Sequence, residues 1–300
     1  MTTTDPLQRT TLELPEGPLS VVTAGDRGTP VVLLGGGGLD NALLSWRHLM
    51  PDLATDHRVV APDWPKQGRS RPWNGVADHA CLVEALQAVM DHFDFERAHL
   101  VGLSQGGAVA LAQAVARPER VDRVVAIAPG AICAYPPGVH QLLWVAARSR
   151  LLNTTLPTLL ARDRSRVAAL ARRGLFAGPV ADFDDVVEEI FEEAAQNGAG
   201  SSDWQNTSVN PWGLQVDLRP QLERIKAPTL FLQGEYDVAV PPRAAIGAVR
   251  RVPGARLRML RGNGHWPNRQ SPGLVNRLVR EFLTEGVPEA GPGSRGESPV

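Results

Sequence analysis

The sequence predicts an α/β fold in which a mostly parallel sheet is covered by helices on both faces. Two observations support this prediction. Short apolar runs alternate with helical patterns, and the alternation stops over one long internal stretch. The chain has 300 residues, which is enough for one large α/β domain that carries an insertion.

The first part of the chain begins with β patterns and then alternates strands with helices. Leu12 and Leu14 alternate with polar residues, and apolar residues resume at Val21 after a turn. Further strands are expected at 31–34, 58–62, 99–101 and 121–128. Helical spacing predicts a helix over 78–93, and small residues predict another over 105–116, which Pro118 ends.

The alternation breaks near Gly130. Between 132 and 222 the sequence has helical patterns and loops but no convincing strand, with a basic run at 148–173 and an acidic run at 182–193. Strands return at 229–232 and 256–260, followed by a closing helix over 272–284. We therefore expect a core in two parts, 1–131 and 223–285, a helical insertion at 132–222, and a disordered tail rich in Gly, Pro, Ser and Glu at 286–300.

Charge and composition limit the possible partners. Lys plus Arg number 31 and Asp plus Glu 32, a net charge of −1, which argues against nucleic acid or an anionic membrane as the main partner. The sequence has no signal-peptide pattern and no run long enough to span a membrane, so we expect a cytoplasmic protein. Cys81 and Cys133 are too few for a disulfide scaffold or a four-thiolate zinc site, and we interpret both as inert buried thiols.

Gly102-Leu103-Ser104-Gln105-Gly106 is the strongest chemical signal in the chain. It lies between an expected strand and an expected helix. A sharp strand-to-helix turn exposes a serine for attack, and glycines on either side leave room for the crowded backbone. A structural serine in a tight turn is the alternative, but the context favours Ser104 as a nucleophile.

Such a serine needs a base and an acid that orients the base. His265 lies in a glycine-rich loop after the last expected strand, and Asp237 follows the strand before it. Loops at the carboxyl ends of strands are where active sites of α/β proteins form. Asp237 alone could be a turn carboxylate, but the order Ser104, Asp237, His265 is that of hydrolases with this turn.

Four glycines, Gly35 to Gly38, follow the strand at 31–34. Glycine lets backbone N–H groups approach a developing oxyanion, so we assign the two donors to the N–H groups of Gly37 and Gln105. A phosphate-binding loop is the rival interpretation, but neither of the sequence patterns for such loops is present.

With these motifs the chain resembles the α/β-hydrolase fold superfamily over about residues 12–285. Ala61-Pro62-Asp63 with Gly68-Arg69-Ser70, and 227–241 around Asp237, are also similar to the family's loops. The resemblance implies an eight-stranded, mostly parallel sheet, with a helical cap inserted after the sixth strand at 132–222. Two departures are Gly35, where the family often has His, and Lys66-Gln67-Gly68, where Gly-His-Gly is usual.

The predicted function is a cofactor-free serine hydrolase. It would cleave a small to medium ester, lactone or related acyl compound through an acyl-enzyme at Ser104. The alternatives are a C–C bond hydrolase, a perhydrolase or an acyl transferase with the same triad, or a ligand-binding protein with slow turnover. No cofactor or metal is expected, and the partner is a small-molecule acyl substrate.

The expected cap should select the substrate. Its arginines could bind an acidic substrate, but a solvated helix face that pairs with the acidic run is favoured. Trp204 and Trp212 lie in a polar loop where large rings need a reason, so we name them as candidate substrate-binding residues, with packing inside the cap as the alternative.

Overall fold

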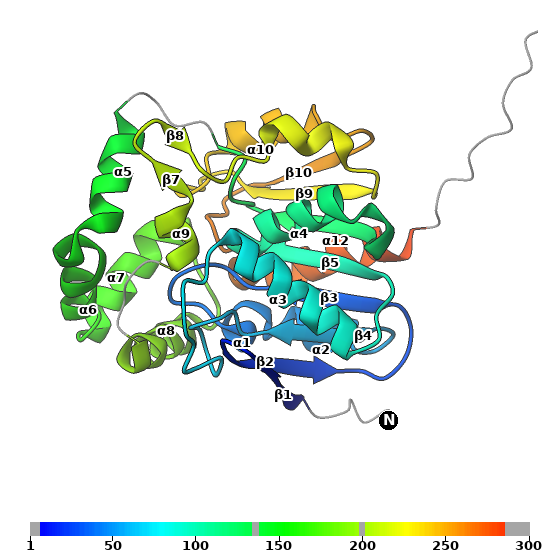
Figure 1. Ribbon diagram of the computed structural model, residues 1–300, viewed down its shortest axis with the longest axis horizontal. Coiled ribbons are helices and arrows are strands. Elements are labelled where there is room, and N and C mark those ends of the chain that lie inside the picture. Colours follow the sequence, from blue (N-terminus) through cyan, green and yellow to red (C-terminus); the bar gives the residue numbers. More distant parts are fainter. Residues whose placement is uncertain (1–6, 134–137, 198–201, 286–300) are drawn as a thin grey trace, which may run out of the picture.

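A computed structural model describes residues 7–133, 138–197 and 202–285, so the tail expected at 286–300 lies outside the described residues. The molecule is built on an eight-stranded sheet (Figure 1). Its strands are β1 (Gln8–Leu14), β2 (Gly17–Ala24), β3 (Pro30–Leu34), β4 (Arg58–Pro62), β5 (Ala98–Leu103), β6 (Val121–Ile127), β9 (Thr229–Gly234) and β10 (Arg256–Leu260).

The order of the strands in the sheet is β1-β2-β4-β3-β5-β6-β9-β10. β2 runs antiparallel to both β1 and β4, and the other pairs are parallel. β5 and β9 are buried along their whole length, which explains their nearly continuous apolar sequences. β10 at the edge exposes Arg256 and Arg258, as expected for an edge strand that avoids further pairing.

Helices cover both faces of this sheet. Two apolar clusters form the core, one on the side of α3, α4 and α10 and the other on the side of α1, α2 and α12. The core helices are α1 (Ala42–Trp46), α2 (Leu49–Leu53), α3 (His79–His92), α4 (Gln105–Ala116), η1 (Pro118–Arg120), α10 (Pro242–Val249), α11 (Pro267–Gln270) and α12 (Pro272–Thr284).

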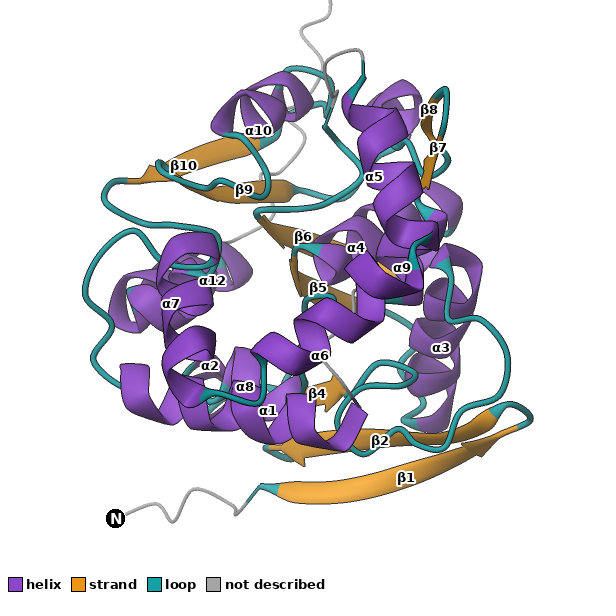
Figure 2. Ribbon diagram, turned by 90° about the vertical axis from the view of Figure 1, so that its left-hand side faces the viewer, coloured by secondary structure: helices purple, strands orange, loops and turns teal. Residues whose placement is uncertain are grey.

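Between β6 and β9 the chain leaves the sheet and forms a helical cap after the sixth strand, as predicted (Figure 2). Its elements are α5 (Val139–Arg148), the π-helical turn η2 (Leu151–Thr155), α6 (Leu156–Leu160), α7 (Arg164–Gly174), α8 (Phe183–Asn197), α9 (Asp203–Thr207), β7 (Val209–Asn210), β8 (Gly213–Leu214) and η3 (Arg219–Arg224). The expectation of no strand in this interval is wrong in one place. β7 and β8 pair as a hairpin of two residues each, too short to leave an apolar pattern.

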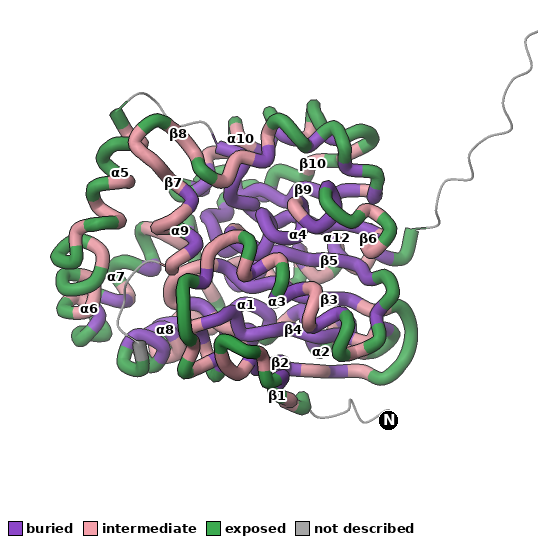
Figure 3. Tube along the Cα trace, viewed as in Figure 1, coloured by how far each residue is buried: buried purple, intermediate pink, exposed green. Residues whose placement is uncertain are grey.

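The cap has an anchored part and an outer part. α8 contributes buried residues such as Val186 and Ile190 to the core. α5, η2 and α6 contain no buried residue and form the outer layer, which is largely exposed in Figure 3. α7 and α9 also contribute buried residues, Val167 and Trp204 among them. The inner elements of the cap therefore hold it to the core, while α5 and α6 lie between its interior and the solvent.

Candidate active site

Ser104 lies in the turn from β5 to α4 with φ 51° and ψ −109°. This left-handed conformation costs a non-glycine residue roughly 1–3 kcal/mol, so the surrounding packing must impose it. A Cβ added at Gly102 would lie 2.3 Å from the Gly106 carbonyl oxygen, and one at Gly106 would lie 2.1 Å from that of Leu34. Both glycines of the motif are thus sterically required, and they fix Ser104 at the N-terminus of α4.

Asp237 and His265 form a buried pair at the carboxyl ends of β9 and β10. Asp237 Oδ2 lies 2.8 Å from His265 Nδ1. The carboxylate also accepts hydrogen bonds from the backbone N–H groups of Ala239 and Val240 and from the side chain of Gln233. Because a carboxylate only accepts, Nδ1 carries the proton and Nε2 remains available as a base.

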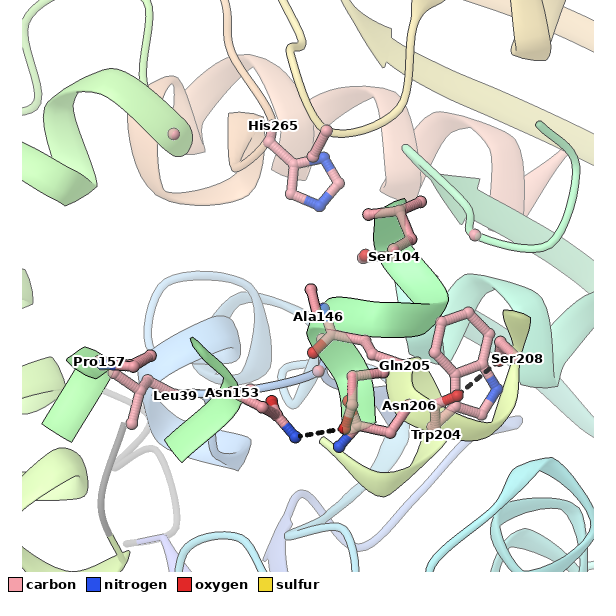
Figure 4. A pocket seen from close by; sticks show the side chains of 18 of the residues that line it. Leu39, Ser104, Ala146, Asn153, Pro157, Trp204, Gln205, Asn206, Ser208 and His265 are labelled. Carbon is pink, nitrogen blue, oxygen red and sulfur yellow. Dashed lines mark hydrogen bonds between the residues drawn. The ribbon is translucent and has the colours of Figure 1, made fainter. Parts of the chain in front are cut away.

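Ser104 and His265 line the same cavity, and Figure 4 shows the imidazole beside the turn that carries Ser104. In the described part of the chain no hydrogen bond joins the Ser104 hydroxyl to the imidazole. In ligand-free sites this contact commonly tightens only when substrate binds. The arrangement can therefore support nucleophilic attack by Ser104, with His265 as the general base and Asp237 as the residue that orients it.

The glycine loop after β3 is fixed by side chains that sequence reasoning did not single out. The N–H of Gly36 donates to Asp40 Oδ2 at 2.5 Å, and that of Gly106 donates to the Gly35 carbonyl. Within the described residues, the backbone N–H groups of Gly37 and of Gln105, the first residue of α4, donate to no other group of the chain. Gly37 lines the same cavity as Ser104, and the role of these two N–H groups as oxyanion donors stays a prediction.

The two departures from the family pattern meet at this loop. The indole N–H of Trp64 donates to the Gly35 carbonyl at 2.9 Å, and Gln67 donates through Nε2 to the Gly38 carbonyl at 2.9 Å. Gln67, in Lys66-Gln67-Gly68, thus supports the oxyanion loop through a side-chain amide. The signal in the sequence was the position of Gln67 in the loop after β4, but its contact needed the fold.

The cavity above Ser104 has a volume of about 740 Å³ and lies under the cap. Among the described residues that line it there is no Lys, Arg, Asp or Glu. Its wall is mostly aliphatic, and its polar side chains away from the triad include Asn153, Gln205, Asn206 and Ser208 (Figure 4). Cys133 also faces it, and burial raises the pKa of this thiol to about 11, so that it stays protonated.

The two tryptophans named from the sequence have different environments. Trp204 on α9 is buried and lines the cavity, and its indole N–H donates to His79 Nδ1 at 2.9 Å. Trp212 is 90% exposed in the turn between β7 and β8 and is not among the residues that line the cavity. The structure therefore does not place Trp212 at this cavity, because the β7–β8 hairpin turns its ring to solvent.

Buried ion pairs connect α8 to the loops around the site. Arg269, which is fully buried on α11, lies 2.6 Å from Asp182 and 3.2 Å from Glu189. Glu193 of α8 pairs with Arg71 and accepts from the Gly68 N–H. These acids belong to the run at 182–193, so its partners are mainly core residues. Among the described residues, Arg164 is the one arginine of the basic run that forms a salt bridge with the acidic run, through an exposed pair with Glu188.

The chain is similar to known hydrolases in sequence and in fold. A family model for the alpha/beta hydrolase fold matches residues 29–272. The chain is 29% identical over 272 residues to 2-hydroxy-6-oxo-6-phenylhexa-2,4-dienoate hydrolase of Burkholderia cepacia, covering 87% of this chain and 89% of that protein. It is 30% identical to 2-hydroxy-6-oxo-2,4-heptadienoate hydrolase of Pseudomonas putida, covering 85% and 89%.

Among solved structures, the fold is similar to that of a 2-hydroxy-6-oxo-6-phenylhexa-2,4-dienoate hydrolase from Rhodococcus. The TM-score is 0.75 at 22% sequence identity, covering 94% of this chain and all of that one. At this identity the likeness concerns the fold alone. With a family model that matches most of its length, the chain belongs to the alpha/beta hydrolase fold family.

Proposed function

We propose that this hydrolase cleaves esters or lactones with an uncharged, apolar acyl group through an acyl-enzyme at Ser104. Ser104 attacks the carbonyl carbon while Nε2 of His265 takes the hydroxyl proton, and Asp237 stabilises the imidazolium. The N–H groups of Gly37 and Gln105 bind the oxyanion. His265 returns its proton to the leaving alcohol and then activates a water, which releases the acid and frees Ser104.

The proposed substrate class rests on the residues that line the cavity. Its described residues provide aliphatic walls and a few amides and hydroxyls but no cationic side chain. An unpaired carboxylate transferred into such a site loses its hydration without a counter-ion, which is strongly unfavourable. The site therefore favours a neutral acyl chain, and its volume of about 740 Å³ accommodates a medium-sized one.

C–C bond hydrolysis of dienoates is the second candidate, and the names of the relatives favour it. A dienoate is a carboxylate, so its bound form needs a cation or several strong donors. The cavity-lining groups that come closest to meeting this requirement are the side-chain amides of Asn153, Asn206 and Gln205. They are neutral, so this candidate has weaker support than the neutral ester.

A matched pair of substrates separates the two candidates. p-Nitrophenyl octanoate and the p-nitrophenyl monoester of suberic acid share an eight-carbon chain, but only the second ends in a carboxylate. We expect kcat/KM to be at least about 100-fold higher for the octanoate, since leaving a charge unpaired costs several kcal/mol. Comparable values, or a higher kcat/KM on 2-hydroxy-6-oxo-6-phenylhexa-2,4-dienoate than on either ester, would overturn the proposal.

Multiple turnover decides between an enzyme and a ligand-binding protein of the same fold. We expect many equivalents of p-nitrophenol per chain on the octanoate. A single stoichiometric burst followed by no further release would favour the binding protein.

The variant Leu156→Arg adds a cation to the cavity wall, and it should raise kcat/KM for the suberate monoester relative to the octanoate.

A further inference from the structure

The helices that roof the cavity have two apolar faces. On α5, Leu143, Ala146 and Ala147 line the cavity at helical spacing. Leu142 and Val145 of the same helix lie beside this stripe, do not line the cavity and are 71% and 52% exposed. An ordinary surface helix is apolar on one face only, so the second face calls for an explanation.

The next segment repeats this division. Leu152, Leu156 and Leu160 line the cavity, although Leu152 and Leu156 are also partly open to solvent. Leu151 and Leu159 are exposed and do not line it. We define the cap outer face as Leu142, Val145, Leu151, Leu159 and Trp212. Gln141 of α5 donates to the Pro211 carbonyl at 2.7 Å, which places the turn that bears Trp212 beside α5, as in Figure 2.

This concentration of exposed apolar side chains is specific to the cap. Among the described residues fifteen large hydrophobic side chains are exposed, and nine of them lie on α5 to α7 or on the β7–β8 turn. Four of these nine, Leu143, Leu152, Leu156 and Leu170, line the cavity, and the other five make up the cap outer face. Isolated exposed hydrophobics are ordinary on a soluble protein, but a contiguous group on adjoining elements marks an interaction surface.

The charge of the same part of the chain favours one kind of partner. Residues 139–173 contain seven Arg and a single acid, Asp163, although the whole chain has a net charge of −1. Arg148, Arg150, Arg162 and Arg173 are exposed and form no salt bridge within the described residues. Arg148 lies over the ring of Trp144, with its Cζ 4.6 Å from the centroid.

We propose that the cap outer face docks on an anionic lipid surface, with its apolar side chains in the interface and its arginines among the head groups. Exposed aliphatic and Trp side chains flanked by Arg are the combination that binds such surfaces. A symmetric contact with a second copy would instead place two arginine-rich segments against each other. The whole-chain balance, which led us to expect no membrane partner, hides this local excess of positive charge.

Docking there would bring the lipid phase to the roof of the cavity, since one layer of helix separates the cap outer face from the cavity. The proposal does not depend on the proposed reaction, because binding to vesicles needs neither Ser104 nor turnover. Ser104→Ala should therefore bind vesicles like the wild type, and a failure of one proposal would leave the other intact.

The test is flotation of the full chain with vesicles of phosphatidylcholine alone and with 30 mol% phosphatidylglycerol, at low and high salt. We expect binding to the anionic vesicles that weakens at least about tenfold between 50 mM and 500 mM salt, and little binding to the neutral ones. The double variant Leu151→Asn/Trp212→Ser and the triple variant Arg148→Gln/Arg150→Gln/Arg162→Gln should each bind at least about tenfold more weakly.

Matched controls on the core are Ile246→Asn and Arg250→Gln, both on or beside α10, and they should bind like the wild type. All variants should keep their hydrolysis of a short, soluble acetate ester, which shows that they are folded. Absence of vesicle binding, or equal binding by the cap variants and the wild type, would overturn the proposal. So would a dimer in sedimentation velocity that Leu151→Asn/Trp212→Ser dissociates, because the face would then be an interface between copies.

Discussion

The carboxylate of Asp40 accepts a 2.5 Å hydrogen bond from the backbone N–H of Gly36, one residue before the proposed oxyanion donor Gly37. The same oxygen accepts from the Ser45 hydroxyl at 2.6 Å, and the other oxygen accepts from the Asn41 N–H. Asp40 is fully buried, and burial raises its pKa to about 7, with the nearby charge of Glu193 acting in the same direction. The geometry of the oxyanion loop is thus linked to one buried carboxyl group.

Replacing Asp40 by Asn should change the pH dependence of stability. Between about pH 4 and pH 7 the folded chain holds a proton on Asp40 that the unfolded chain has released. The free energy of unfolding of the wild type should therefore fall as pH rises through this window, by up to about 1.4 kcal/mol per pH unit, relative to Asp40→Asn.

Urea unfolding at four pH values between 4.5 and 7.5 measures this difference. Asp26→Asn, which changes an exposed acid, serves as the control and should follow the wild type. Parallel pH profiles for Asp40→Asn and the wild type would show that Asp40 is ionised throughout and that its burial has no such effect.

Ser104→Ala should abolish turnover, with a loss on the order of 10⁴ to 10⁶ in kcat, because nucleophile and base act as a unit. A fluorophosphonate probe should label the wild type at Ser104 and leave the variant unlabelled, which peptide mass spectrometry can locate. Labelling of another serine, together with residual activity of Ser104→Ala, would refute the assignment.

Asp237→Asn should lower kcat by about 10⁴, because the amide favours the wrong imidazole tautomer. The matched control is Glu235→Gln, two residues earlier in the same turn. The Glu235 side chain accepts the Gly262 N–H at 3.0 Å, a contact that an amide oxygen can keep, so little loss is expected. The measurement is kcat for both variants on one ester, and the opposite ranking would assign the acid to Glu235.

Much of the core could be predicted from the sequence because its patterns are long and local. The helices at 105–116 and 272–284 form with the predicted bounds, and the strand at 58–62 does as well. α1, α2 and α10 were missed, since helices of five to eight residues are too short to show a helical period.

The candidate site was likewise predictable where its signals are local and not where they depend on the fold. The arrangement of Ser104, Asp237 and His265 could be inferred because each follows a strand of a parallel sheet, so that chain order places them at one edge. The contacts of Asp40 and Gln67 with the glycine loop could not, because they join segments whose approach only the folded sheet defines. The same holds for Trp204 and Trp212, which lie eight residues apart but face opposite environments.

Those two tryptophans provide the last prediction. Trp204 packs its ring against Gly130, whose N–H donates to the Ser104 carbonyl at 2.8 Å, whereas Trp212 is exposed. Trp204→Ala removes apolar wall beside the nucleophile and should lower kcat/KM on a bulky ester by about 1–3 kcal/mol, the scale of lost pocket contacts. A short acetate ester needs less of that wall and should be affected less. Trp212→Ala should leave kcat/KM on both dissolved substrates unchanged.

The experiment measures kcat/KM for each variant on p-nitrophenyl acetate and on p-nitrophenyl octanoate, below the concentration at which the octanoate aggregates. Thermal melts of each variant are also needed to detect a loss of stability. Trp204 donates a hydrogen bond to His79, so Trp204→Ala leaves a buried imidazole without that partner. Equal losses on the two esters for Trp204→Ala would mean that Trp204 supports the cap and not the acyl group. A selective loss for Trp212→Ala would mean that the β7–β8 turn folds over the cavity when substrate binds.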